Sequence, residues 1–272
     1  MPDDTSRLTE EEQAHADDLA SPKTRVIYEV VRRQGEEELG RPLGSLFWSG
    51  IAAGVAIMAS VIAEGALLHK LPASLPGREA IGDFGYTAGF LLTILGRMQL
   101  FTEQTIVTVL PNMATPRWDK LGRTGLLWTI VFGANLLGAA AAAWIDLDLH
   151  LVSPGLAASM LDVASALQNK APLEILAQAV PAGFIIASVA WIRAGVSDGE
   201  VWIVLLLTYL IALGDFTHVV AGSAETFLLL FDGRISPAQA FGGIILPALV
   251  GNIIGGTGLF ALLAHAQVSQ EI

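Results

Sequence analysis

The chain has no cysteine among its 272 residues, so it has neither a disulfide framework nor a thiolate metal site. Charged residues are scarce at 15%, whereas a soluble domain averages about 25%. The HExxH zinc pattern and the GxSxG nucleophile elbow are also missing, which argues against a membrane enzyme. Apolar residues are abundant instead, at 53%, and the mean hydropathy is +0.58. We therefore predict a polytopic membrane protein that is not an enzyme and needs no cofactor or metal.

Six segments are apolar over about 20 residues, the length that crosses the hydrocarbon core of a bilayer. They are Leu46–Leu68, Phe84–Leu110, Leu126–Ile145, Ile175–Ile192, Val201–Phe231 and Phe241–Leu263. The second segment contains the polar stretch GRMQLFTEQT and the fifth contains GDFTHVVAGSAE. The sequence thus predicts an all-α bundle of six transmembrane helices in which helices two and five are broken.

Polar segments flank this apolar region and suggest the domain organisation. The predicted parts are an acidic cytoplasmic tail at 1–24, an amphipathic surface helix at 25–41, a six-span transporter domain at 42–265 and a cytoplasmic tail at 266–272. The amphipathic helix has Val26, Ile27, Val30 and Val31 on one face, and we expect it to lie along the inner membrane surface. Lysine and arginine concentrate in alternate loops, which predicts that both termini are cytoplasmic.

Spans one to three resemble spans four to six. Phe101-Thr102 and Phe216-Thr217 occur in the two broken spans, at an offset of 217 − 102 = 115. Asparagines follow in the next spans, Asn135 in FGANLLGA and Asn252 in LVGNIIGG, and AAGVAIMASV in span one matches PAGFIIASV in span four. Because three spans are an odd number, the second copy must be inverted, which is a transporter or channel architecture with its site near the bilayer midplane.

The two breaks are expected to line a permeation pathway, because non-helical backbone at membrane depth needs protein or water to satisfy it. Two half-helices from opposite sides would direct free N–H groups and positive dipole ends to one place, which favours a small anion. Thr102 and Thr217 could add hydroxyl donors there. His218 is the one histidine inside a predicted span, and it could share a proton with the anion so that a neutral acid crosses the apolar constriction.

These features, with LFTEQT and the histidine-bearing DFTHVVAG, resemble the formate/nitrite transporter family over residues from about 40 to 265. The long acidic tail and FTHVVAGSAE are similar to its YfdC-type inner-membrane branch. The resemblance implies an aquaporin-like fold, a homopentamer with one pathway per protomer, location in the bacterial inner membrane, and passage of monovalent anions or weak acids such as formate, nitrite and hydrosulfide.

The resemblance also implies site residues. Leu100, Phe101 and Thr102 would form a constriction on the cytoplasmic side, and His218 would be the central histidine, with Phe216 and Thr217 beside it in the pathway. Three positions depart from the family pattern: Thr217 replaces the usual glutamate before the histidine, Gly183 stands where many members have asparagine, and Glu103-Gln104 replaces a small residue and asparagine.

Other polar residues near the breaks have electrostatic or supporting roles in this interpretation. Glu103 and Asp215 are candidate gating groups. Arg97 could be their counter-ion, or it could extend to the membrane interface. Asn135 and Asn252 are expected to support the backbone of the breaks.

We therefore expect a channel or proton-linked carrier whose partners are small monovalent anions or weak acids, protons, the lipid bilayer and further copies of the chain, with no nucleic acid. Two alternatives remain open at this point. One is a neutral-solute channel of aquaporin type, although the paired Asn-Pro-Ala loops are missing. The other is a non-conducting sensor or scaffold.

Overall fold

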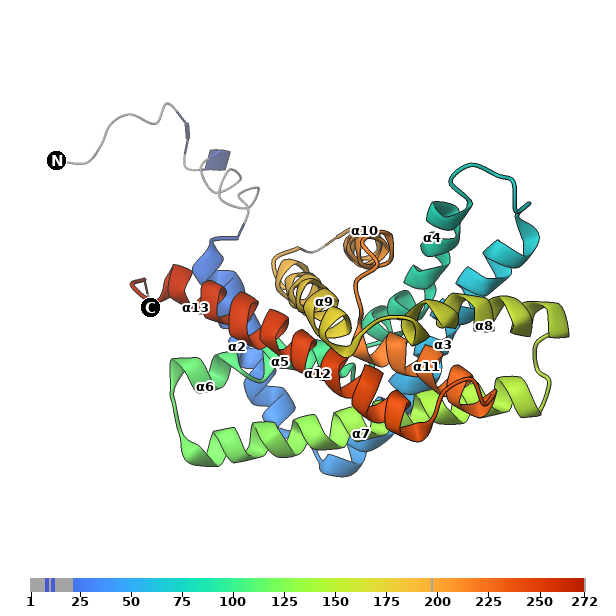
Figure 1. Cartoon of the computed structure of the whole chain (residues 1–272). Helices are drawn as coiled ribbons and strands as arrows, with labels where there is room; N and C mark the ends of the chain where they lie inside the picture. The colour runs from blue at the N-terminus through green and yellow to red at the C-terminus, as the bar shows by residue number, and fades with distance from the viewer. Residues whose placement is uncertain (1–7, 10, 13–21, 197, 272) are drawn as a thin grey trace.

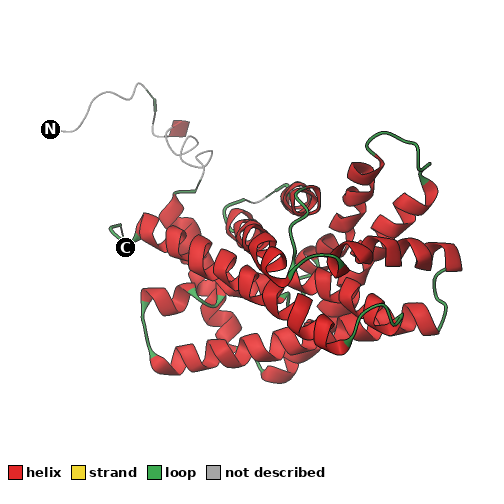
Figure 2. Ribbon diagram, in the orientation of Figure 1, coloured by secondary structure: helices red, strands yellow, loops and turns green. Residues whose placement is uncertain are grey.

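The computed structural model describes residues 8–9, 11–12, 22–196 and 198–271, and these contain helices and no strands (Figure 2). Most of the predicted acidic tail, residues 1–7, 10 and 13–21, lies outside the described residues. In chain order the elements are α2 (Thr24–Gly40), α3 (Leu43–Lys70), α4 (Arg78–Phe90), the π-helical η1 (Leu91–Leu95), α5 (Phe101–Val107), α6 (Leu110–Ala114), α7 (Trp118–Asp148), α8 (Pro154–Gln168), α9 (Pro172–Arg193), α10 (Glu200–Leu213), α11 (Val219–Phe231), the π-helical η2 (Gln239–Ile245), α12 (Leu246–Ile253), the π-helical η3 (Ile254–Ala261) and α13 (Leu262–Val268).

Within the described residues, four helices are long and apolar enough to cross a bilayer: α3, α7, α9 and the continuous helix Gln239–Val268, which comprises η2, α12, η3 and α13. They match predicted spans one, three, four and six, and each is longer than predicted. The hydropathy pattern marks only the part of a helix that suits lipid, whereas the helices continue into polar residues at their ends.

Predicted spans two and five are broken, as expected. Helix two consists of α4 with η1, then α5, while helix five consists of α10, then α11. Neither α10 nor α11 is long enough alone to cross a bilayer. The two breaks therefore lie within the bundle.

The halves of the bundle repeat each other, with the second copy inverted. Helix α3 packs against α7 in the first half, and α9 packs against α12 and η3 in the second. At one end of the bundle lie α2, α6 and α13, and at the other lie α8 and the connection between α3 and α4 (Figure 1). The six-helix arrangement from two three-helix repeats is the predicted fold class.

Helix α8 was not predicted. It begins with two local signals: Pro154 is its first residue, and the Ser153 hydroxyl caps it by accepting a hydrogen bond from Leu156 N at 3.3 Å. It packs against α3 and α11 and so covers the end of the bundle opposite α2. At 15 residues it is too short to span, which is why a search for spans passed over it.

Helix α2 matches the predicted amphipathic helix, but part of its apolar face is buried against the protein. Its buried residues are Tyr28, Val31, Gly35 and Leu39, and they pack on the protein. The Tyr28 hydroxyl is 2.7 Å from His265 Nδ1 of α13. Val26, predicted to be on the apolar face, is 48% exposed. The predicted apolar face is therefore divided, since Val31 is buried against the protein and Val26 is not. The position of α2 along the inner membrane surface stays a prediction.

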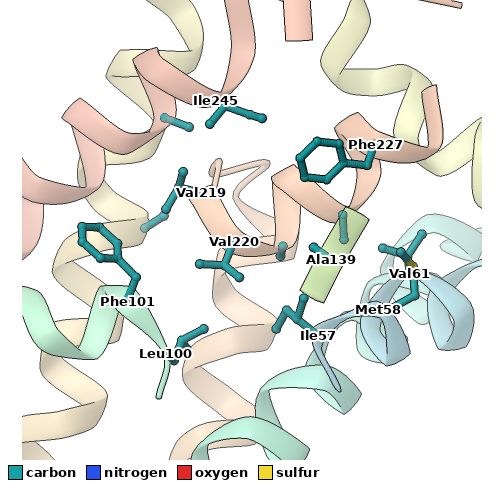
Figure 3. Close-up of a cluster of buried hydrophobic side chains, with 14 of the residues drawn as sticks. Ile57, Met58, Val61, Leu100, Phe101, Ala139, Val219, Val220, Phe227 and Ile245 are labelled. Atoms are coloured by element: carbon teal, nitrogen blue, oxygen red, sulfur yellow. The ribbon is translucent and has the colours of Figure 1, made fainter. Parts of the chain in front are cut away.

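The core between the halves is apolar. Leu100 and Phe101 from the first break lie beside Val219 and Val220 from the second (Figure 3). All four side chains are at most 2% exposed. The two breaks therefore meet across a dry layer of hydrocarbon side chains.

Candidate functional site

Each broken helix reverses its backbone in the same way. Arg97 and Asp215 have φ angles of 54° and 53°, which lie in the left-handed region that most side chains avoid. Leu100 and His218 then adopt nearly identical extended conformations, with φ/ψ of −94°/120° and −94°/125°, before α5 and α11 begin. The two positive-φ residues are 215 − 97 = 118 positions apart, and so are the two extended ones, at 218 − 100 = 118.

This geometry corrects the register of the repeat. The predicted offset of 115 paired Phe101 with Phe216, but the structural counterpart of Phe101 is Val219, at 219 − 101 = 118. The shared Phe-Thr dipeptide is therefore a coincidence three residues out of step. His218 is the counterpart of Leu100, so the site carries an imidazole on one side and an alkyl group on the other.

Two asparagines hold the breaks in place. Asn135 Oδ1 accepts from Phe101 N at 2.9 Å, and its Nδ2 donates to Gln99 O at 2.8 Å and to a carbonyl of α3 at 2.9 Å. Asn252 Oδ1 accepts from Val219 N at 2.8 Å, and its Nδ2 donates to Thr217 O at 3.0 Å and to a carbonyl of α9 at 2.8 Å. Each side chain thus joins a break to two neighbouring helices of its own repeat.

The carbonyls on α3 and α9 belong to Gly50 and Ala179, at 179 − 50 = 129. The same offset relates Gly54 and Gly183 in the predicted match of spans one and four, 183 − 54 = 129, so that register agrees with the geometry. A Cβ on Gly183 would lie 2.3 Å from Asn252 O. No side chain fits at this position. Where the resemblance places an asparagine in many family members, this chain has a close contact between two helices.

The amides at the starts of α5 and α11 are largely used inside the protein. Phe101 N and Val219 N donate to the asparagines, and Ala221 N donates to His218 Nδ1 at 3.2 Å. These three amide groups are therefore not free to bind an anion, contrary to the expectation for the starts of the two half-helices. The Thr217 hydroxyl is a further polar group at the centre, buried and without a hydrogen-bond partner among the described residues.

His218 is the point where the two repeats meet by a polar contact. Its Nε2 is 2.6 Å from Thr102 Oγ1, and the two residues are 1% and 0% exposed. Since Nδ1 accepts the Ala221 amide proton, the hydrogen bonds assign the neutral tautomer with the proton on Nε2, which donates to Thr102. The ring of Phe90 stands edge-on to the imidazole at 4.9 Å between centroids.

Two cavities approach this contact from opposite ends. The first, which we call the α8 vestibule, has a volume of about 560 Å³ and contains Phe216, Thr217 and His218 in its lining. The second, the α2 vestibule, has a volume of about 390 Å³ and contains Gln99 and Glu103.

Leu100, Phe101 and Thr102 line neither cavity and lie buried between them. The Phe101 ring packs on Phe132 of α7 at 5.0 Å between centroids. The chain in this state is closed between the vestibules.

The charged residues predicted near the breaks have partners that the sequence did not reveal. Arg193 of α9 pairs with Glu103 at 3.1 Å and with Glu200 at 2.9 Å, and the Arg193 and Glu103 side chains are only 9% and 13% exposed. Arg97 is 70% exposed in its side chain and contacts Glu200 at 3.4 Å. It does not pair with Glu103 or Asp215, the first alternative, and its exposure agrees with the second, an arginine that extends outward from the break. Asp215 pairs with a lysine that follows α8, Lys170, at 2.7 Å.

Comparisons with known proteins agree with this architecture. The family model described as Formate/nitrite transporter matches residues 25–266. The chain is 36% identical to "Inner membrane protein YfdC" of Escherichia coli (strain K12) over 94% of this chain and 82% of that protein. It is 25% identical to "Uncharacterized transporter YrhG" of Bacillus subtilis (strain 168) over 91% and 95%.

Solved structures of similar fold cover nearly the whole bundle. A structure described as "FNT family ion channel" has a TM-score of 0.72 at 18% identity and covers 90% of this chain and 98% of that one. A "Pentameric formate channel with formate bound" has a TM-score of 0.70 at 17% identity and covers 84% and 98%. On the match of the family model and on the identity to YfdC, the chain belongs to the formate/nitrite transporter family.

Proposed function

We propose that the chain conducts small monovalent anions, or the weak acids they form, through each protomer of a homopentamer in the bacterial inner membrane. The observation that supports this most directly is the buried hydrogen bond between His218 Nε2 and Thr102 Oγ1, because a path that joined the two vestibules would pass this imidazole. Formate is the first candidate, since it is bound in the pentameric channel of similar fold.

His218 would share a proton with the permeant only while the permeant is present. The Nδ1 atom accepts the Ala221 amide proton at the start of α11, and a second proton on the ring would remove this cap and place positive charge at the positive end of the helix. An arriving anion offsets that unfavourable charge. The imidazolium and anion then form a neutral pair, which the surrounding apolar layer tolerates far better than a lone ion.

The hydroxyls of Thr102 and Thr217 would replace part of the hydration shell of the permeant. Thr217 is 3% exposed, and its Oγ1 has no hydrogen-bond partner among the described atoms. The Thr102 hydroxyl accepts the hydrogen bond from His218 Nε2, so its own hydrogen can be donated to the permeant. Leu100 and Phe101 form the apolar constriction beside this site, and Phe216 forms part of its wall on the α8 side.

Glu103 would not repel anions from the α2 vestibule as a bare charge would, because Arg193 neutralises it. Arg97 and Asp215 sit at the rims of the vestibules with their own partners, where they can shape the electrostatic field. In the proposed topology both termini are cytoplasmic, so the α2 vestibule opens to the cytoplasm and the α8 vestibule opens to the opposite side.

The test is uptake of formate, nitrite, hydrosulfide, acetate and lactate into proteoliposomes at two external pH values. We expect uptake of at least one small acid to rise as the external pH falls, and His218→Phe to abolish it while the protein keeps its oligomeric size. His69→Phe, which alters an exposed histidine at the end of α3, is the matched control and should leave uptake unchanged. Uptake of neutral solutes alone, without pH dependence, would instead support an aquaporin-like channel, and no uptake of any kind would support a sensor.

A further inference from the structure

One face of α11 carries a second titratable group above the central histidine. His218, Gly222 and Glu225 are four and then three residues apart, which places them on the same helical face. All three line the α8 vestibule. At about 1.5 Å of rise per residue, Glu225 lies about 10 Å from His218 along the helix axis.

Glu225 is 9% exposed, and within the described part of the chain no hydrogen bond or ion pair involves its carboxyl group. Its neighbours on the helix, Ser223 and Thr226, are satisfied by donating to carbonyls one turn earlier, at 2.5 Å each. A buried carboxyl without a partner is unfavourable for folding. Packing alone does not account for a glutamate at this position.

The helix surface between Glu225 and His218 faces the cavity at Gly222. A Cβ on Gly222 would make ordinary van der Waals contacts with the side chains of Leu167 and Thr217, at 3.5 and 3.6 Å, so no close backbone contact requires the glycine. The Thr217 hydroxyl, buried and unpartnered, lines the same cavity at its inner end. A polar molecule or a short row of water can therefore reach from the carboxyl to the hydroxyl and the imidazole.

The walls of the α8 vestibule contain more acids than bases. Helix α3 contributes Glu64, α4 contributes Arg78, Glu79, Asp83 and Tyr86, α8 and the residue after its end contribute Asp162 and Lys170, and the break of helix five contributes Asp215. Lys170 is occupied by Asp215 at 2.7 Å. Four other elements pack on α11, namely α5, α7, η2 and α12, and none of them adds a titratable group to this lining. Such a cavity attracts protons and repels anions.

We propose that Glu225 is the proton-loading group of this cavity, a proposal that depends on the proposed function. Its carboxyl takes a proton from water at the open end of the vestibule and passes it, through water beside Gly222, to an anion held at Thr217 and His218. The carboxyl O–H bond breaks as the anion gains its proton, so a neutral acid forms and Glu225 returns to carboxylate. A hydronium ion from the solution on the same side then reprotonates the carboxylate, so each cycle takes up one proton and one anion and yields one molecule of neutral acid.

The test compares Glu225→Gln with Glu225→Asp in proteoliposomes across a range of external pH. In the wild type, uptake limited by protonation of one group changes by up to about tenfold per pH unit. Glu225→Gln should flatten this dependence and lower uptake at acid pH by about tenfold or more, since the amide cannot carry a proton. Glu225→Asp should keep the pH dependence at reduced rate. Glu174→Gln, which alters an exposed carboxylate in the first turn of α9 outside the lining of the vestibule, is the matched control and should behave as the wild type.

A second measurement does not depend on transport. The infrared difference spectrum between acid and neutral pH should contain a protonated-carboxyl band that disappears in Glu225→Gln and persists in Glu174→Gln. A pH profile of Glu225→Gln that has the wild-type shape, or a spectrum that keeps the band, overturns the inference while leaving the proposed function intact. A uniform loss of uptake at every pH in both Glu225 variants also overturns it, because that is the signature of a structural role. Wild-type protein that takes up no acid refutes the proposed function itself, and the inference with it.

Discussion

Replacing Asn252 by alanine should detach the break of helix five from the helices that hold it. The side chain joins Val219 N, Thr217 O and Ala179 O, at 2.8, 3.0 and 2.8 Å, and it is fully buried. The Ala179 carbonyl lies inside α9, where it keeps its intrahelical partner. The change therefore leaves two groups without a partner, the amide of Val219 and the carbonyl of Thr217.

The magnitude follows from those two groups. A buried polar group that loses its hydrogen bond costs about 1–3 kcal/mol, so Asn252→Ala should lower the free energy of unfolding by about 2–6 kcal/mol. Because Thr217 and Val219 flank His218, the imidazole should also lose its fixed distance to Thr102. Transport should fall even in protein that remains folded.

The assay is unfolding of the purified protein in detergent, together with hydrogen exchange of peptides that cover residues 213–222. Asn169→Ala is the matched control, since that asparagine is exposed and makes one bond, to Ser165 O at 3.2 Å. It should change stability by less than about 0.5 kcal/mol. A loss below about 1 kcal/mol for Asn252→Ala, with unchanged exchange at the break, would refute the view that this side chain holds the break.

Three further changes test other contacts. Arg193→Met should destabilise the protein by about 3 kcal/mol, because it leaves the buried Glu103 carboxylate unpaired, and adding Glu103→Gln should recover at least half of this loss in a double-mutant cycle. Gly183→Ala should lower the free energy of unfolding by about 2 kcal/mol or more, because its Cβ would lie 2.3 Å from a backbone oxygen of α12. Gly122→Ala, whose Cβ would meet no atom within 4 Å, should raise the free energy of unfolding by about 0.5–1 kcal/mol. Equal thermal shifts for the two variants would contradict the packing argument. Two arginines of α2 lower the pKa of Glu29 from 4.5 to about 2, so the carboxylate adds stability above about pH 4.5 that is lost as the pH falls toward 2. With a side chain 39% exposed, solvent screening limits this to less than about 1 kcal/mol, and the stability difference from Glu29→Gln should shrink over that pH range in acid titration.

The fold was largely predictable because its causes are local in the sequence. About 20 apolar residues predict a span wherever they occur, and the polar stretches in spans two and five predict the breaks. The short helix α8 escaped this reasoning, although Ser153 and Pro154 are local signals for its start. A capping signal ahead of an apolar stretch too short to span would have identified it.

The site was predictable in part. His218 and Thr102 were singled out because polar groups in a span are unfavourable without a reason, and the structure places them 2.6 Å apart. The counter-ion of Glu103 was not predictable: Arg193 lies 90 positions away, and nothing in the local pattern distinguishes it from the nearer Arg97. Ion pairs between distant segments depend on how the helices pack.

The amino-acid sequence alone was enough to predict the spans, the two breaks and the buried histidine, because each follows from the free energy of placing particular residues in lipid. It also predicted the internal repeat, because the matching motifs of the two halves can be compared directly. Only the tertiary structure decided the register of the repeat, because the hydrogen bonds of Asn135 and Asn252 pair Phe101 with Val219 rather than with Phe216. The packing of the helices also determines that Glu103 pairs with an arginine, whereas Glu225 faces a cavity. Those outcomes depend on distances between helices, which no local pattern contains.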